Sequence, residues 1–243
     1  MLPAMAFPTT RWSVVLGATR KGSGEDAAPP KALHELCAAY WRPLYAYLRR
    51  AGHSPQDAED AVQGFLSSLL SGSAFAHVDR DRGRFRSYLL GAMRNFLAKQ
   101  RERGEALKRG GGHTIVPLEI DTDDAERRLE PRDDRTPEAE YAHAWAMEIL
   151  ARTRGRLREH YEGRSQAELF ATLQPFLVSN EPPTYKDVAT QLGMNEAAAR
   201  VAVHRLRTAF RQRLREEVAD TVAEETDIDD ELRAVIEAVR DHA

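Results

Sequence analysis

The chain has 243 residues, enough for one large or two small domains, and its helix-forming residues far outnumber the β-branched residues that favour strands. The formal net charge of −3 excludes a uniformly basic nucleic-acid coat. No apolar run of about 18 residues and no leader of basic then apolar residues is present, so we expect a cytoplasmic protein. The composition predicts an all-α fold.

The first half of the chain predicts an N-terminal extension and one helical domain. In residues 1–30 a short capped helix is followed by the Gly- and Pro-containing stretch RKGSGEDAAPP. Three longer amphipathic helices are expected in residues 31–104, the second of them capped by Ser54. The single cysteine, Cys37, excludes a disulfide framework and a cysteine metal site. Its apolar neighbours favour a buried filler over a reactive thiol.

The second half predicts a linker, a further helical domain and a tail. Residues 105–136 are rich in Gly and acidic side chains and are interpreted as the linker. Helices resume over 137–217, which we expect to form the second domain. Residues 218–243 make an acidic C-terminal extension with a final amphipathic helix.

The charge is segregated along the chain. Residues 79–109 hold ten Lys/Arg against four Asp/Glu, and residues 184–215 hold seven against two. Each basic block is followed by an acidic stretch, and residues 216–243 carry about −9. This pattern suggests two separate contacts with polyanions, although solvated helix faces would give the same counts.

A helix-turn-helix pattern lies in residues 185–207, YKDVATQLGMNEAAARVAVHRLR. Gly193 stands where the turn between two helices commonly needs a positive φ. Asn195 can accept a hydrogen bond from the free amides that open the next helix. That helix would expose basic side chains, namely Arg200, His204, Arg205, Arg207 and Arg211. Arginines on such a helix can pair with guanine edges or with phosphates, so the pattern predicts DNA binding.

Two stretches together resemble the extracytoplasmic-function (ECF) sigma factors of the sigma-70 family. The acidic helix SPQDAEDAVQGFLSSLL and the basic stretch GRFRSYLLGAMRNFLAKQRER are similar to their region 2. The stretch TYKDVATQLGMNEAAARVAVHRLRTAFRQRLREE is similar to their region 4. The segments TTRWSVVL and DIDDELRAVI look like a subgroup with N- and C-terminal extensions. The resemblance implies a region 2 helical bundle and a region 4 helix-turn-helix joined by a linker, with a helical C-terminal extension.

The resemblance implies a dissociable subunit that directs bacterial RNA polymerase core to specific promoters for transcription initiation. The acidic helix would bind the β′ clamp helices through Asp57, Glu59, Asp60 and Gln63, and the β flap is a further expected contact. Exposed carboxylates can pair with arginines of a partner, but a solubilising face is the alternative interpretation.

The same resemblance implies two promoter-binding sets. The minus 10 element would be contacted by Arg84, Phe85, Arg86, Tyr88, Asn95, Lys99, Arg101 and Arg103. Arg84 and Arg86 can neutralise phosphate, whereas the rings of Phe85 and Tyr88 either stack on an unstacked base or belong to the core. The minus 35 element would be read by Arg200, Val201, His204 and Arg205, with Arg207 on phosphate.

The alternative function is a conventional helix-turn-helix regulator that binds an operator as a dimer. It leaves the first basic block without a role. Catalysis is not expected, because RGGGH lacks the following Lys-Ser/Thr of a phosphate loop and no nucleophile elbow is present. We expect no catalytic residue, metal, cofactor or membrane partner. An anti-sigma factor is one expected regulator, and autoinhibition by the C-terminal extension, folded back on a basic DNA-binding face, is the other.

Overall fold

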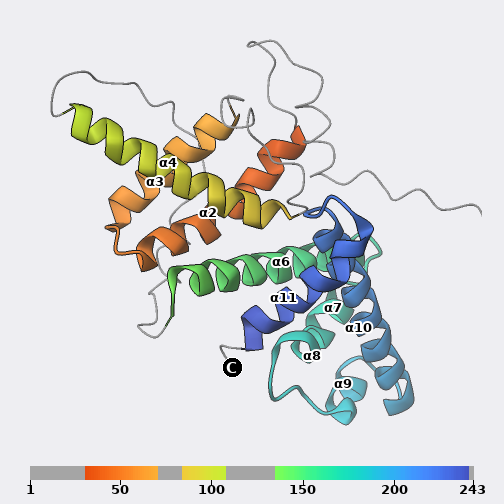
Figure 1. Ribbon diagram of the computed structural model, residues 1–243. Helices are drawn as coiled ribbons and strands as arrows, with labels where there is room; N and C mark the ends of the chain where they lie inside the picture. Colours follow the sequence, from red (N-terminus) through yellow and green to blue (C-terminus); the bar gives the residue numbers. More distant parts are fainter. Residues whose placement is uncertain (1–30, 71–83, 108–134, 241–243) are drawn as a thin grey trace, which may run out of the picture. The chain divides into compact units, whose positions relative to one another are not determined.

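The fold is helical throughout the part of the chain that the computed structural model describes, which is residues 31–70, 84–107 and 135–240 (Figure 1). No β-strand occurs in these three ranges, and the all-α prediction is confirmed there. The predicted N-terminal extension, most of the predicted linker and the loop before the basic helix lie outside the described residues.

The chain divides into two compact units. Unit 1 contains the residues up to Glu148 together with Ala219–Ala243, and unit 2 is Ile149–Val218. The sequence predicts a boundary at residue 137 and a separate extension from residue 218. In the structure residues 137–148 and the C-terminal residues belong to the first unit, and both contribute buried side chains.

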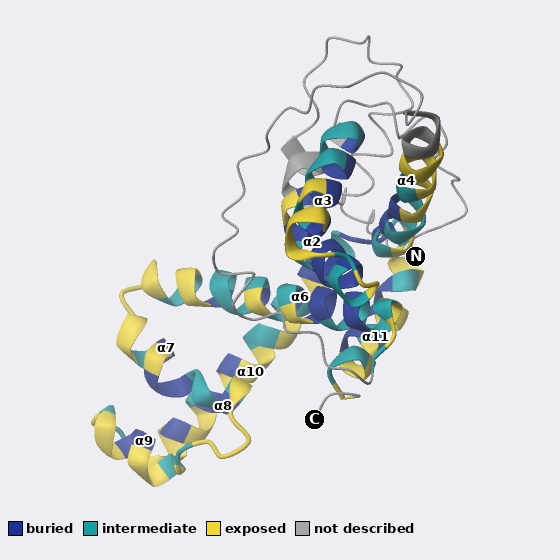
Figure 2. Ribbon diagram, turned by 90° about the vertical axis from the view of Figure 1, so that its left-hand side faces the viewer, coloured by how far each residue is buried: buried dark blue, intermediate teal, exposed yellow. Residues whose placement is uncertain are grey.

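The core of unit 1 lies between three helices that pack on one another: α2 (Lys31–Arg50), α3 (Pro55–Leu70) and α4 (Phe85–Leu107). Each contributes an apolar stripe at helical spacing. Leu44 of α2, Val62 of α3 and Leu89 of α4 are completely buried, and Figure 2 shows such buried faces on α2 and α3, with the exposed face of α3 in yellow.

The first part of α6 (Pro137–Glu162) completes this core. The indole nitrogen of Trp145 donates a hydrogen bond to the hydroxyl of Tyr40 at 3.0 Å, and both side chains are buried. Tryptophan is buried here with its polar atom paired, which removes the cost of an unsatisfied donor.

The C-terminal residues are also part of unit 1. They form a 3-10 turn, η2 (Glu225–Asp227), and an amphipathic helix, α11 (Ile228–Arg240). Val222, Ile228 and Val235 are buried. The backbone N–H of Phe85 donates to the carbonyl of Thr221 at 3.0 Å, beside an isolated antiparallel bridge between Arg84 and Val222. The extension is therefore anchored at the start of α4.

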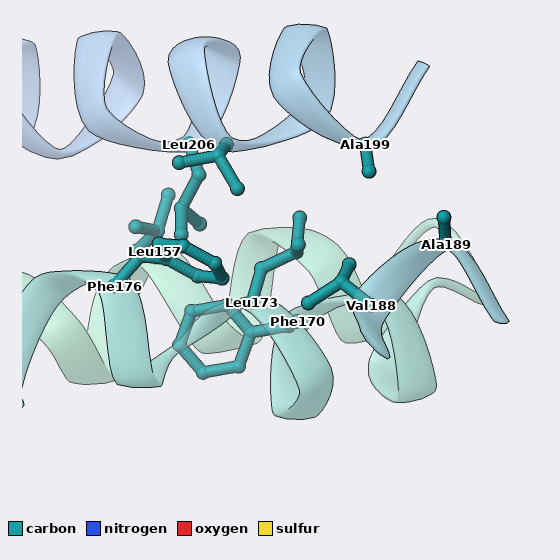
Figure 3. Packing of buried hydrophobic residues seen from close by; sticks show 9 residues of the cluster. Leu157, Phe170, Leu173, Phe176, Val188, Ala189, Ala199 and Leu206 are labelled. Atoms are coloured by element: carbon teal, nitrogen blue, oxygen red, sulfur yellow. The ribbon is translucent and has the colours of Figure 1, made fainter. Parts of the chain in front are cut away.

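Unit 2 is built from the rest of α6 and four further helices: α7 (Ala167–Leu173), α8 (Pro175–Val178), α9 (Tyr185–Gln191) and α10 (Glu196–Ala219). Figure 3 shows its core, where Leu206 and Ala199 of α10 point toward Val188 of α9 and the side chains of α6, α7 and α8. This packing fixes α9 and α10 against each other.

Candidate nucleic-acid interface

The α9–turn–α10 segment has the local geometry that its sequence predicts. Thr184 and Asp187 form a capping box at the start of α9, with the Asp187 N–H donating to Thr184 Oγ1 at 3.2 Å. Gly193 has a φ of 62°, and Asn195 Oδ1 accepts from the N–H of Ala198 at 2.8 Å. Both predictions for the turn are confirmed, and α10 starts from a fixed corner.

The helix α10 separates an apolar face from a basic one. Ala199, Val203 and Leu206 are buried at helical spacing. All five side chains of the predicted minus 35 set are exposed on the other faces: Arg200, Val201, His204, Arg205 and Arg207. Val201 is 49% exposed and lies between these basic side chains in the sequence. An aliphatic group among arginines is suited to contact with a thymine methyl group in a major groove.

Two arginines of this surface are positioned by aromatic rings. The Arg200 guanidinium lies 4.6 Å from the centroid of the Tyr185 ring and pairs with Glu196 at 2.6 Å. The Arg207 guanidinium lies 6.0 Å from the Phe176 ring, and that ring stacks on Tyr185 at 5.4 Å. Such cation–π contacts restrict the arginine rotamers before any ligand binds.

Phe176, Tyr185 and Glu196 are members of this surface that the sequence pattern does not predict. Glu196 could have been found from the i,i+4 spacing to Arg200 on a helix. The stacked rings could not, since Phe176 and Tyr185 lie in different helices and meet only through the fold of unit 2.

Some side chains of the predicted minus 10 set are exposed to solvent, whereas others are buried or paired with carboxylates of the same chain. Asn95, Lys99 and Arg101 are exposed on α4. The side chain of Arg103 lies outside the described residues. Arg94, which the prediction omits, is exposed on the same helix, donates to the Tyr47 hydroxyl at 3.2 Å and pairs with Glu138. The middle of α4 thus carries a solvent-facing polar surface with positive charge.

Phe85 is a core residue in this structure. Its ring is completely buried and meets the Tyr40 ring edge-on, with centroids 5.0 Å apart. Of the two roles that the sequence allows, core and base stacking, this arrangement matches the core, because no ring face is open. Tyr88 is half-buried, and burial, with a smaller contribution from Cys37, raises its pKa to about 12.

Arg84 and Arg86 are paired with carboxylates of the C-terminal helix. Glu231 accepts from Arg86 Nε at 2.6 Å and from Arg86 Nη2 at 3.1 Å, and it lies 3.6 Å from Arg84 Nε. Asp230 accepts from Arg84 Nη2 at 3.3 Å. Glu231 itself is completely buried. The pair of Arg86 and Glu231 is bidentate, the arrangement in which arginine binds carboxylates and phosphates most strongly.

The surroundings of Arg86 fix its guanidinium further. It lies 4.8 Å from the centroid of the Trp145 ring, and the backbone carbonyl of Arg86 accepts from the Tyr141 hydroxyl at 2.9 Å. Burial disfavours the charge of Arg86, but the hydrogen bond and the charge of Glu231 outweigh it, so the pKa of Arg86 is raised. Trp145, Tyr141 and Glu231 are partners of Arg86 that the sequence pattern does not predict.

The predicted polymerase-binding residues lie on the outer side of α3. Asp57 and Asp60 are exposed, and Glu59 and Gln63 are half-buried. Asp57 has a structural role in addition, because Ser54 Oγ donates to its carboxylate at 2.6 Å and accepts from its N–H at 3.1 Å. Ser54 is thus the cap that the sequence predicts.

The described residues contain no group of three or more His, Cys, Asp or Glu side chains that could hold a metal ion. None of their helices is both long and apolar enough to cross a membrane.

Comparison of the chain with protein-family models, with curated proteins and with solved structures finds no match.

Proposed function

We propose that this chain is an alternative-type sigma factor that directs bacterial RNA polymerase core to specific promoters. The observation that carries the proposal is the capped helix-turn-helix of unit 2, whose second helix exposes a basic surface beside Val201. A helix presented in this way fits the major groove of B-DNA, where arginines can pair with guanine. In the proposal α10 reads the minus 35 element through Arg200, Val201, His204 and Arg205, with Arg207 on phosphate.

The surfaces of unit 1 support the other two contacts of the proposal. The exposed Asn95, Lys99 and Arg101 of α4 provide positive charge and hydrogen-bond donors for the backbone of the minus 10 strand. On α3, Asp60 is exposed and Glu59 is half-buried, so both carboxylates can reach basic side chains of the β′ clamp helices.

The first test is binding to purified bacterial core RNA polymerase, followed by size-exclusion chromatography and a titration of affinity. The variant Glu59→Gln/Asp60→Asn removes two charges while keeping side-chain shape. Asp57 is left unchanged because it belongs to the cap of α3. The matched control is Glu159→Gln/Glu168→Gln, two exposed carboxylates of unit 2.

We expect the native protein and the control to co-elute with core polymerase. Loss of two ion pairs of about 0.2–1 kcal/mol each would weaken the binding of the α3 variant by about 2- to 30-fold. If the native protein does not bind core polymerase, the sigma proposal is wrong. A search for an inverted-repeat operator bound by a dimer would then test the conventional regulator. If the variant and the control bound core polymerase equally well, only the proposal that α3 contacts the β′ clamp helices would be wrong.

The reading of the minus 35 element has a test of its own once a promoter sequence is known. Arg205→Ala should lose about 1–3 kcal/mol of discrimination at one base pair, because a bidentate contact to a guanine is lost. Arg207→Ala should instead weaken binding to all sequences about equally, as expected for a phosphate contact. Competition binding with single-base promoter variants separates the two outcomes. Unchanged base preference in Arg205→Ala would contradict its assignment.

A further inference from the structure

The start of α4 is the place where the basic surface of unit 1 meets carboxylates from the same chain. Arg84 and Arg86 are paired with Asp230 and Glu231, which follow them by about 145 residues. Residues 219–240, here called the C-terminal segment, reach this place through the buried Val222 and Ile228. The contact is therefore part of a packed structure and is not a chance encounter of surface charges.

We propose that the C-terminal segment is a built-in competitor for nucleic acid: its carboxylates occupy Arg84 and Arg86 in place of the phosphates of a bound strand. The inference rests on the proposed function and on the further expectation that Arg84 and Arg86 also contact the minus 10 strand. A carboxylate and a phosphate offer an arginine the same paired oxygen acceptors. Glu231 uses both of its oxygens in this way.

The geometry makes simultaneous binding unfavourable. Glu231 is completely buried, and Arg86 is held between this carboxylate and the Trp145 ring, so a phosphate reaches the Arg86 guanidinium only after Glu231 leaves. Because competitor and site belong to one chain, the effect does not depend on protein concentration. While the C-terminal segment is in place, a strand therefore binds without the phosphate contacts of these two arginines.

A purely structural contact is the alternative, and the two explanations differ in one observable. If the contact only holds unit 1 together, loss of the Glu231 charge lowers stability and leaves strand binding unchanged. If it competes with a strand, the same change adds up to two phosphate contacts. Each added contact steepens the dependence of log K on log salt by about 0.7 for a single strand.

The experiment compares the native full-length protein with Glu231→Gln by fluorescence anisotropy of a labelled oligothymidine strand over a range of salt concentrations. The control is Glu237→Gln, which makes the same change of net charge at an exposed position of α11. We expect the salt slope of Glu231→Gln to be steeper by about 0.7–1.4. At the upper value its affinity falls about sevenfold more than that of the native protein between about 50 and 200 mM salt. The slope of Glu237→Gln should match the native one.

Equal slopes for Glu231→Gln and Glu237→Gln would overturn the inference. Should Glu231→Gln lose its far-UV circular dichroism signal, Asp230→Asn decides, since Asp230 is exposed and pairs with Arg84. This second variant should steepen the slope by at most about 0.7, because Glu231 still lies 3.6 Å from Arg84 Nε, and a slope equal to that of the control would again overturn the inference. Binding of the native protein to core polymerase is measured in parallel. Failure there refutes the proposed function, whereas the slopes are measured without polymerase.

Discussion

Replacing Gly193 by alanine should destabilise unit 2, and the structure gives both the size and the cause. Gly193 has a φ of 62°, and a Cβ atom built there meets no heavy atom within 4 Å. The change therefore adds no clash, and its cost comes from the left-handed backbone alone, about 1 kcal/mol. Gly155 is the matched control, since its Cβ would also meet nothing within 4 Å but it lies inside α6. There alanine should stabilise the helix by about 1 kcal/mol.

Hydrogen exchange of backbone amides, followed by mass spectrometry, measures both effects within unit 2 of the full-length protein. A change of 1 kcal/mol in the free energy of opening alters the exchange rate of protected amides about fivefold. We expect faster exchange in α9 and α10 for Gly193→Ala and slower exchange in α6 for Gly155→Ala. If Gly193→Ala slowed exchange as well, the turn would not need a left-handed residue, and the helix-turn-helix geometry would be wrong.

Thiol reactivity, helix capping and the buried ion pair lead to three further expected outcomes. Burial raises the pKa of Cys37 to about 12, so Ellman's reagent should detect the one thiol only after denaturation, and rapid labelling of the native protein would contradict its burial. In thermal melts Asp57→Ala should cost about 1 kcal/mol, because the hydrogen bond from Ser54 Oγ to the Asp57 carboxylate at the start of α3 is lost, whereas Asp60→Ala should stay within about 0.5 kcal/mol; equal losses would refute this role of the Asp57 side chain. The double change Arg86→Met/Glu231→Leu should leave the thermal midpoint unchanged or raise it, and a loss of several kcal/mol would indicate that unit 1 needs the charges.

The parts that the sequence predicts correctly are those determined by neighbouring residues. Gly193 has its role in the turn itself, and Asn195 caps an amide only three positions later. Both could therefore be identified without knowledge of the fold. The apolar spacing of α10 likewise identifies its buried face. The exposure of the predicted minus 35 set follows from that face, because a helix whose buried stripe is known has its remaining positions in solvent.

The parts that the sequence does not predict depend on contacts between distant residues. Phe85 is the first residue of the basic helix α4, and the sequence allows it to be exposed. In the structure it is buried and contacts the Tyr40 ring of α2. The excess of acidic residues after residue 216 indicates an attraction to some basic surface, yet net charge does not identify which arginines it reaches. The boundary between the two units at residues 148 and 149 has no signal in the sequence either, since α6 continues as one helix from unit 1 into unit 2.

The buried pair of Arg86 and Glu231 raises the question of why unit 1 has two charged side chains where apolar ones could pack. Removing two charges from water is costly, and apolar side chains of similar volume commonly give equal or better stability than a buried ion pair. Stability alone therefore does not account for an arginine at position 86. In the competition that we propose, Arg86 needs its charge to bind phosphate, and an intramolecular carboxylate keeps that charge paired while no strand is bound. The completely buried Glu231 provides this pairing with both of its oxygens.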